Sequence, residues 1–281
     1  MKYKRFSALT ILASIALSGC YVDLGFIKFG KPSKNAEAYD AKADAEAISE
    51  YYSDINDSLV GNSLLNSLKA LNGQKKEKDI GYSSMGTGPS GYFKYTDFDP
   101  ASVKYNSEGV PFGTKILSFY SGISTTSFNR EHVWPKSRGG DKVENDILMV
   151  RPTIKEENSD RGNSSYVTGK ATEHNGWDPV TAFSNTIGVA ESIRGECARI
   201  IFYCLTAATG LTLSDTTGVG SNDMGKLTDL VKWSCENPVS IREKRRNVGS
   251  QYVQGNRNAF VDHPEYVCRI WGNSNSSTKT A

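Results

Sequence analysis

The sequence has no large excess of charge of either sign, and histidine is scarce. Its 281 residues hold 33 Lys and Arg against 31 Asp and Glu, with three histidines at positions 132, 174 and 263. This balance excludes bulk positive charge as the means of binding nucleic acid, so any attraction to phosphate must come from local clusters. Close Cys-x-x-Cys pairs are also absent, which argues against a structural zinc cluster.

Long apolar runs of membrane-spanning length are missing at the N-terminus. The uncharged run from Phe6 to Leu17 holds about a dozen residues, whereas a membrane-spanning helix needs roughly 20. The run follows the basic residues Lys2, Lys4 and Arg5. A basic start and a short apolar core are typical of a secretory signal. We therefore expect residues 1–19 to be a signal peptide and the protein to be exported.

The end of the apolar run carries a second indication. The sequence Leu17-Ser18-Gly19-Cys20 resembles the bacterial lipobox, which implies cleavage before Cys20 and a lipid on its thiol. The alternative is an ordinary signal peptide with an incidental cysteine. Tyr21 stands where inner-membrane retention signals place Asp, which favours the outer membrane or cell surface. The expected localisation is therefore lipid-anchored to the cell envelope through Cys20.

Removal of the signal changes the charge of the protein. Residues 1–19 contain three basic residues and no acidic one, so 33 basic against 31 acidic residues become 30 against 31. The mature protein is then close to neutral. Its hydrophobic fraction of 38% allows one sizeable domain or two small ones.

The rest of the chain is organised around helices. Residues 20–40 are rich in Gly, Lys, Ser and Ala and are expected to form a tether. Apolar spacing predicts helices over 41–54, 59–71, 191–208 and 227–235. A further helix is expected to begin after Asn237-Pro238, with the asparagine as its cap. Residues 80–115 are expected to form loops and short strands, and residues 273–281 a disordered tail.

The middle of the chain has a different pattern. A short strand ending near Glu131-His132 precedes a loop with Gly139 and Gly140, and the apolar residues 147–150 are suited to a buried strand. Residues 153–162 can form a short helix. The order strand, loop, strand, helix predicts a compact hairpin-plus-helix unit. With the surrounding helices it gives an α+β fold.

The dipeptide Glu131-His132 is the strongest candidate for chemistry. Hydrolysis of a phosphodiester requires a base near neutral pH, which histidine supplies, and a hard divalent ion held by carboxylate and amide oxygens. Neighbouring side chains of an extended strand point to opposite faces. The pair can therefore share one site only where the strand bends or ends, which Pro135 and the glycines allow.

Several separated blocks of the sequence match one family in the same order. They are YYSDINDSLVGNSLLNSLKAL, YSGISTTSFNREHVWPKS, DILMVRP, KEENSDRGN, RGECARIIFYC and QGNRNAFVDHPE. Through these blocks the chain resembles the bacterial endonuclease I family, over roughly residues 50–272. The resemblance implies a ββα-metal (His-Me) motif embedded in a mostly helical single domain over residues 41–272.

The same resemblance implies roles for three residues. His132 would be the general base that activates water. Glu131 and Asn158 would ligate one Mg²⁺ ion, with Mn²⁺ or Ca²⁺ as alternatives. Without the resemblance, an asparagine at the start of a helix is more often a cap.

The arginines are expected to hold phosphate. Arg138, Arg151 and Arg161 lie within the motif, and Arg161 is favoured for the scissile phosphate or for structural bracing because it lies about one helical turn from Asn158. We expect Arg138 to act with Arg161 in catalysis and Arg151 to bind substrate. Arg245 and Arg246 belong to a basic cluster that would add sequence-independent phosphate contacts. A solvated helix face or salt bridges are the alternatives.

One departure from the family pattern concerns Leu148-Met149, where the family carries polar residues. The expected function is a largely sequence-nonspecific endonuclease acting on DNA, with RNA as a further substrate, as a monomer. The alternative is a catalytically weak surface lipoprotein that binds nucleic acid or a host ligand, and this departure is its best support.

Four cysteines remain after Cys20. Cys197 and Cys204 are about 10 Å apart along a helix at 1.5 Å per residue, too far for a mutual disulfide. Any bridge from either one must reach Cys235 or Cys268, and free buried thiols are the alternative.

Overall fold

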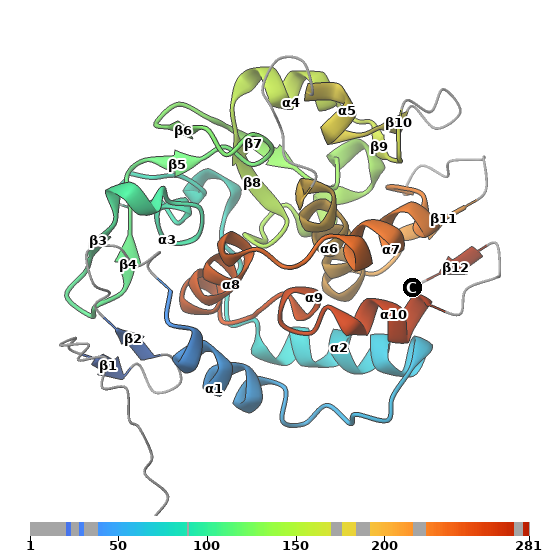
Figure 1. The fold of residues 1–281 in the computed structure, drawn as a ribbon, viewed down its shortest axis with the longest axis horizontal. Helices are drawn as coiled ribbons and strands as arrows, with labels where there is room; N and C mark the ends of the chain where they lie inside the picture. Colours follow the sequence, from blue (N-terminus) through green and yellow to red (C-terminus); the bar gives the residue numbers. More distant parts are fainter. Residues whose placement is uncertain are drawn as a thin grey trace, which may run out of the picture.

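The computed structural model describes residues 21–23, 28–30, 39–88, 90–169, 176–183, 192–215, 223–272 and 278–280. Helices dominate this part of the chain, and small two-stranded sheets join them (Figure 1). The α-helices are α1 (Ala41–Tyr51), α2 (Gly61–Lys75), α3 (Phe93–Thr96), α4 (Lys155–Arg161), α5 (Pro179–Phe183), α6 (Ser192–Ala207), α7 (Leu227–Glu236), α8 (Ile241–Gln254), α9 (Ala259–Asp262) and α10 (Glu265–Trp271). Short 3-10 helices are Tyr82–Ser84, Pro100–Ser102, Lys136–Arg138 and Gly140–Val143. The expected α+β fold is confirmed.

The strands pair in twos. Antiparallel pairs join β1 (Tyr21–Asp23) to β2 (Lys28–Gly30), β3 (Lys104–Tyr105) to β4 (Pro111–Phe112), β5 (Ile116–Leu117) to β6 (Ser124–Thr125), β7 (Asn129–His132) to β8 (Val150–Thr153), and β11 (Thr212–Ser214) to β12 (Thr278–Thr280). A parallel pair joins β9 (Ser165–Tyr166) to β10 (Gly176–Trp177).

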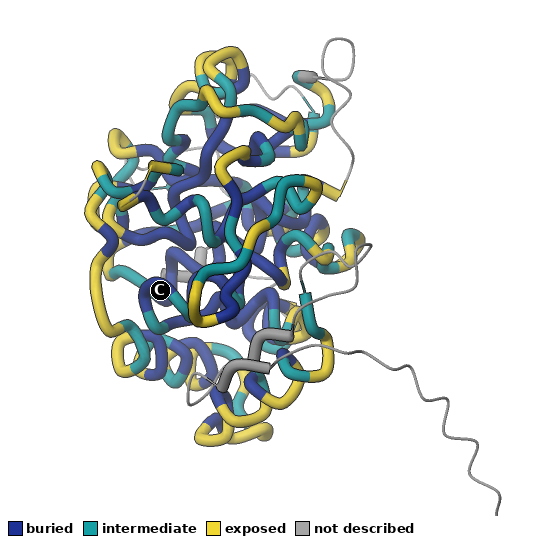
Figure 2. The backbone as a smooth tube through the Cα atoms, turned by 90° about the vertical axis from the view of Figure 1, so that its left-hand side faces the viewer, coloured by how far each residue is buried: buried dark blue, intermediate teal, exposed yellow. Residues whose placement is uncertain are grey.

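Helix α6 lies at the centre of the helical part. It packs against α2, α5, α7 and α9, and its residues are buried along most of its length. Figure 1 shows α2 and α10 running side by side below it, while β7, β8 and α4 lie above. The buried segments gather in the interior in Figure 2, and the exposed ones lie at the periphery. One hydrophobic cluster extends from the residues of α2 through α6 to those next to β7.

The predicted hairpin-plus-helix unit is present. In the β7–β8 pair, Glu131 lies opposite Arg151 and His132 opposite Val150. Helix α4 follows β8 after one residue and packs against β7. The unit is therefore a ββα motif, as expected.

Two predicted boundaries were wrong. Residues 147–149 are buried but form a turn before β8, because the Asp146 side chain accepts a hydrogen bond from the Leu148 backbone and Arg246 binds the backbone carbonyl of Ile147. The helix expected to be capped by Asn237 begins later, at Ile241. Its cap is Ser240, whose side chain and that of Glu243 form a capping box.

Some predictions fall at the chain ends. Residues 1–20, including the signal segment and Cys20, lie outside the described residues. Within the predicted tether the structure describes β1, β2 and residues 39–40, and within the predicted tail it describes β12. Across the described ranges, every helix is too short or too polar to span a bilayer.

Candidate functional site

The end of β7 places Glu131 and His132 in different surroundings. Glu131 is only 2% exposed, while its neighbours Arg130 and His132 are half-buried. This difference between neighbours follows from the two-residue repeat of a strand. The strand ends at His132, and the chain then turns at Pro135.

A tight turn follows the strand. Gly139 has φ of 89°, in the left-handed region, which glycine adopts readily. A Cβ on Gly140 would come within 1.9 Å of the backbone oxygen of Trp134. The two glycines therefore allow the chain to fold back closely beside the end of β7.

Glu131 is held by two buried side chains. The Tyr120 hydroxyl donates a hydrogen bond of 2.8 Å to Glu131 Oε1, and Arg161 Nη1 lies 3.3 Å from the same oxygen. Burial raises the pKa of Glu131, while Arg161 and the bond from Tyr120 oppose that rise. The neighbouring carboxylate of Glu157 also raises this pKa.

Arg161 acts as a brace between α4 and β7. Its guanidinium donates to the backbone oxygens of His132 (2.9 Å) and Val133 (2.6 Å), and the residue is 1% exposed. The side chain thus fixes both the Glu131 carboxylate and the strand end. This matches the bracing alternative for Arg161.

His132 stacks on an aromatic ring that sequence reasoning missed. The rings of Tyr82 and His132 are 4.9 Å apart between centroids and 26° from parallel. His132 Nε2 is buried, and no described residue hydrogen-bonds to it. Burial, and then the positive charge of Lys136, lower the pKa of His132 to about 4. The imidazole is therefore neutral at neutral pH and able to accept a proton.

The turn that carries Tyr82 is fastened to the motif. Arg130 Nε donates to the Met85 oxygen at 2.8 Å, and its Nη2 to the Ser83 oxygen at 3.1 Å. The backbone NH of Tyr82 donates to Asn145 Oδ1 at 3.1 Å. Because these contacts join segments about 45 to 63 residues apart, no local pattern could have placed Tyr82 beside His132.

Helix α4 presents two further oxygen-bearing side chains. Glu157 Oε2 accepts from Ser118 Oγ at 2.6 Å and from the Tyr120 backbone NH at 3.4 Å, while buried Glu157 Oε1 has no hydrogen-bond partner among the described residues. Asn158 is half-buried and lies inside α4, whose N-cap is Ile154. The capping alternative for Asn158 therefore does not apply.

Arg138 binds backbone near the motif. Its Nε donates to the Asn163 oxygen at 2.7 Å and its Nη1 to the Asp223 oxygen at 3.1 Å. The side chain is half-buried. In this structure it connects the loop after β7 to the segment after α4.

Three other arginines expected at the substrate lie in the interior, and this corrects the predicted substrate contacts. Arg151 and Arg246 each place Nε 3.0 Å from Asp97 Oδ1, and Arg151 also binds Glu196. Arg245 has its guanidinium 4.9 Å from the centre of the Phe98 ring. Exposure is 1%, 3% and 4% for Arg151, Arg246 and Arg245. Buried charges must be paired, and Asp97 and Glu196 supply that pairing for Arg151 and Arg246. Arg245 donates to the backbone oxygen of Phe98 at 3.4 Å. In this structure the three guanidinium groups are therefore turned toward the protein interior.

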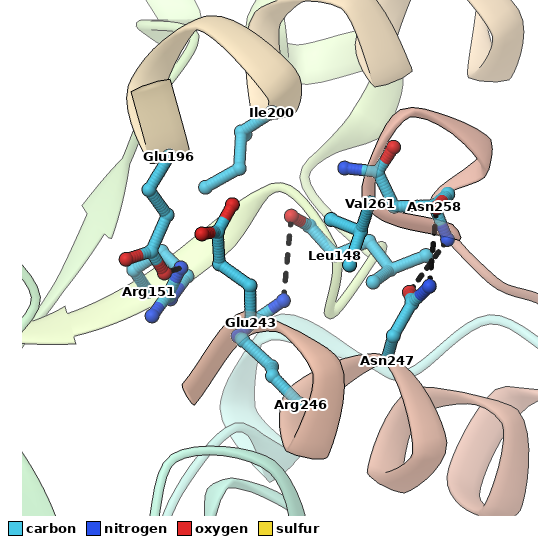
Figure 3. A pocket seen from close by; sticks show the side chains of 9 residues that line it. All are labelled: Leu148, Arg151, Glu196, Ile200, Glu243, Arg246, Asn247, Asn258 and Val261. Atoms are coloured by element: carbon cyan, nitrogen blue, oxygen red, sulfur yellow. Dashed lines mark hydrogen bonds and ion pairs between the residues drawn. The ribbon is translucent and has the colours of Figure 1, made fainter. Parts of the chain in front are cut away.

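Figure 3 shows Arg151, Glu196, Arg246 and Leu148 around a small interior cavity. Its volume of about 10 Å³ suits at most one water molecule. Leu148 and Met149 are 3% and 0% exposed. Both belong to the hydrophobic cluster, which gives the departure at these positions a packing role.

Known proteins match the part of the chain that contains the site residues. The Endonuclease I family model matches residues 75–265, which include Glu131, His132 and Asn158. The chain is 34% identical over 204 residues to an extracellular ribonuclease of Bacillus amyloliquefaciens and 33% identical over 205 residues to an extracellular ribonuclease of Bacillus subtilis (strain 168). Each alignment covers 63% of this chain and 65% of the relative, so the chain spans just under two thirds of the relatives' length.

Proposed function

Because the chain belongs to the endonuclease I family, we propose that it is a metal-dependent endonuclease that hydrolyses phosphodiester bonds of DNA with little sequence specificity. The single observation that carries the proposal is the end of β7. There a neutral, half-buried His132, whose Nε2 has no hydrogen-bond partner among the described residues, follows a carboxylate held by Arg161. RNA is a second proposed substrate, since both relatives carry the name ribonuclease.

His132 is proposed as the general base. A neutral imidazole can take a proton from the water that attacks phosphorus. The ring is held in place by Tyr82 on one face, and its strand is held by the two backbone bonds from Arg161. These contacts limit the rotation of the side chain and of the strand end, which keeps the accepting nitrogen oriented.

Glu131 and Asn158 are proposed to hold the metal ion. Their carboxylate and amide oxygens are the donors that hard cations prefer, and Mg²⁺ commonly binds to one or two carboxylates while keeping water and phosphate oxygens as its other ligands. Buried Glu157 Oε1, which has no hydrogen-bond partner within the described ranges, adds an oxygen on α4 at the position before Asn158. The described part of the chain holds no cluster of three or more His, Cys, Asp or Glu suited to a metal, at this site or elsewhere, so the proposed site depends on few protein oxygens and on water. When bound, the ion would neutralise charge on the phosphate.

The surface around Tyr82 is proposed to contact the nucleic-acid backbone. The Arg130 guanidinium lies 5.0 Å and Lys136 Nζ 5.8 Å from the centre of the Tyr82 ring. Lys136 is exposed and forms an ion pair with Glu144. Two cationic groups beside the proposed base give sequence-independent attraction to phosphate.

Metal removal is the direct test of this proposal. Supercoiled plasmid should be nicked by the purified protein with Mg²⁺, should stay intact after EDTA treatment, and should be nicked again when Mg²⁺ is restored. Parallel reactions with Mn²⁺, Ca²⁺ and a single-stranded RNA measure ion and substrate preference. Inertness toward DNA and RNA with all three ions would overturn the enzyme proposal and leave a nucleic-acid-binding lipoprotein.

We also propose that the protein is exported and anchored to the cell envelope by a lipid on Cys20. Both relatives are named extracellular, which supports export, and the proposed anchor depends on the sequence before Cys20. Radiolabelled palmitate should enter the wild-type protein and should not enter the Cys20→Ser variant. Equal labelling of both proteins would contradict the anchor.

A further inference from the structure

The four cysteines of the folded part fall into two unlike pairs. Cys197 and Cys204 in α6 are fully buried, and burial raises the pKa of both thiols. Cys235 and Cys268 are exposed, and their Sγ atoms lie 3.0 Å apart. The second pair therefore has both the proximity and the access that the first pair lacks.

The close approach comes from the packing of two helices. Cys235 lies near the end of α7 and Cys268 in the middle of α10, and these helices pack against each other. The two residues are 33 positions apart in the sequence, so the contact is a product of the tertiary fold. A disulfide needs an S–S distance of about 2.0 Å, which requires a shift of only about 1 Å from the present separation.

We propose that Cys235 and Cys268 form a disulfide bond when the protein meets an oxidising compartment. One thiolate attacks a small-molecule disulfide such as oxidised glutathione, forming a mixed disulfide and releasing one thiolate of the oxidant. The thiolate of the second cysteine then attacks the Sγ of the first cysteine, which forms the Cys235–Cys268 bond and releases the other half of the oxidant as a thiolate. Two S–H bonds are thereby replaced by one S–S bond, each cysteine loses a proton, and the two electrons reduce the oxidant to two thiols.

The bond would close the segment that carries α8 and α9. This segment contains buried Arg246 and Arg257, whose ion pairs with Asp97 and Asp44 connect it to the rest of the chain. A covalent link across its ends reduces the freedom of the unfolded chain, and the stabilisation grows with loop length. Because oxidising compartments favour disulfides, this stabilisation fits an exported protein.

The first test counts thiols in the full-length chain with Cys20→Ser, so that four cysteines remain. The protein is incubated with oxidised glutathione at about pH 8.5, denatured and alkylated, and its peptides are mapped by mass spectrometry. Alkaline pH is chosen because burial and the Cys268 thiol raise the pKa of Cys235 to about 11. We expect two alkylated residues, Cys197 and Cys204, and one linked peptide pair. Four alkylated residues, or a bridge to Cys197 or Cys204, would overturn the proposal.

The second test measures stability. Reduction with dithiothreitol should lower the Tm of the oxidised protein by about 5–10 °C. The same treatment should leave the Tm of a Cys235→Ser/Cys268→Ser variant unchanged, which is the matched control. An equal shift in both proteins would contradict the proposal. Neither readout depends on nuclease activity, so the outcome is separate from that of the proposed function.

Discussion

Replacing His132 with alanine is expected to lower kcat for plasmid nicking by about 10²–10⁴-fold, which is the usual contribution of a general base. The free energy of unfolding should change little in comparison, because the main backbone bonds that hold this strand end come from Arg161 to carbonyl oxygens that the variant retains. Initial rates with saturating DNA and Mg²⁺, together with a thermal unfolding curve, measure both quantities.

A second histidine provides the matched control. His263 is also partly buried and stacks on Tyr266, but it lies beside α10 and bonds to Glu265. The His263→Ala variant should keep the wild-type kcat per folded molecule. Added imidazole should restore part of the activity of His132→Ala and none to a variant that has simply lost its fold. Equal kcat values for His132→Ala and wild type would remove His132 from the proposed mechanism.

The pH profile supplies a second measurement of the same prediction. A base works in its neutral form, so activity is lost as pH falls through its pKa. With the pKa of His132 at about 4 rather than 6.5, kcat should stay near its neutral-pH value well below pH 6.5. The Tyr82→Ala variant removes the ring that covers His132 and exposes the imidazole to water. Its pKa should then rise, so the acidic limb of the kcat profile should move to higher pH. Tyr82→Phe keeps the ring and should leave the limb unchanged.

The motif is predictable from the sequence because its signals are local. The strand ending at His132, the glycine turn and the helix around Asn158 depend on neighbours in the chain, and the structure confirms them as a ββα unit. The expected roles of Glu131, His132 and Asn158 come from the sequence blocks shared with the family.

What sequence reasoning missed depends on contacts between distant segments. Arg245 and Arg246 lie in a run of basic residues that normally indicates a solvated or phosphate-binding helix face. In the fold, Arg246 pairs with Asp97, which lies 149 positions away in the sequence. No local sequence pattern predicts that partner. Tyr120 was within a recognised block, yet its bond to Glu131 becomes visible only when the loop after β5 is placed beside β7.

Substitution of Arg161 is expected to have the second large effect, and that effect is on the stability of the fold more than on the catalytic step. Substitution with methionine should lower the free energy of unfolding by about 3–5 kcal/mol, since breaking a buried ion pair leaves the other charge without its partner. Here that charge is Glu131, 2% exposed, and the His132 and Val133 oxygens lose their donor as well. Urea unfolding followed by tryptophan fluorescence measures the change.

The controls separate bracing from phosphate binding. Lys244→Met removes an exposed cation of α8, and it should change the unfolding free energy by less than about 0.5 kcal/mol. In the double variant Glu131→Gln/Arg161→Met, a neutral amide replaces the buried carboxylate that has lost its ion-pair partner. This variant should be more stable than Arg161→Met alone. If Arg161 instead bound the scissile phosphate, Arg161→Met would retain wild-type stability and lose turnover. Because Arg161 makes three contacts to the end of β7, we expect Arg161→Met to lose stability. Its activity should fall because the strand bearing His132 is no longer held.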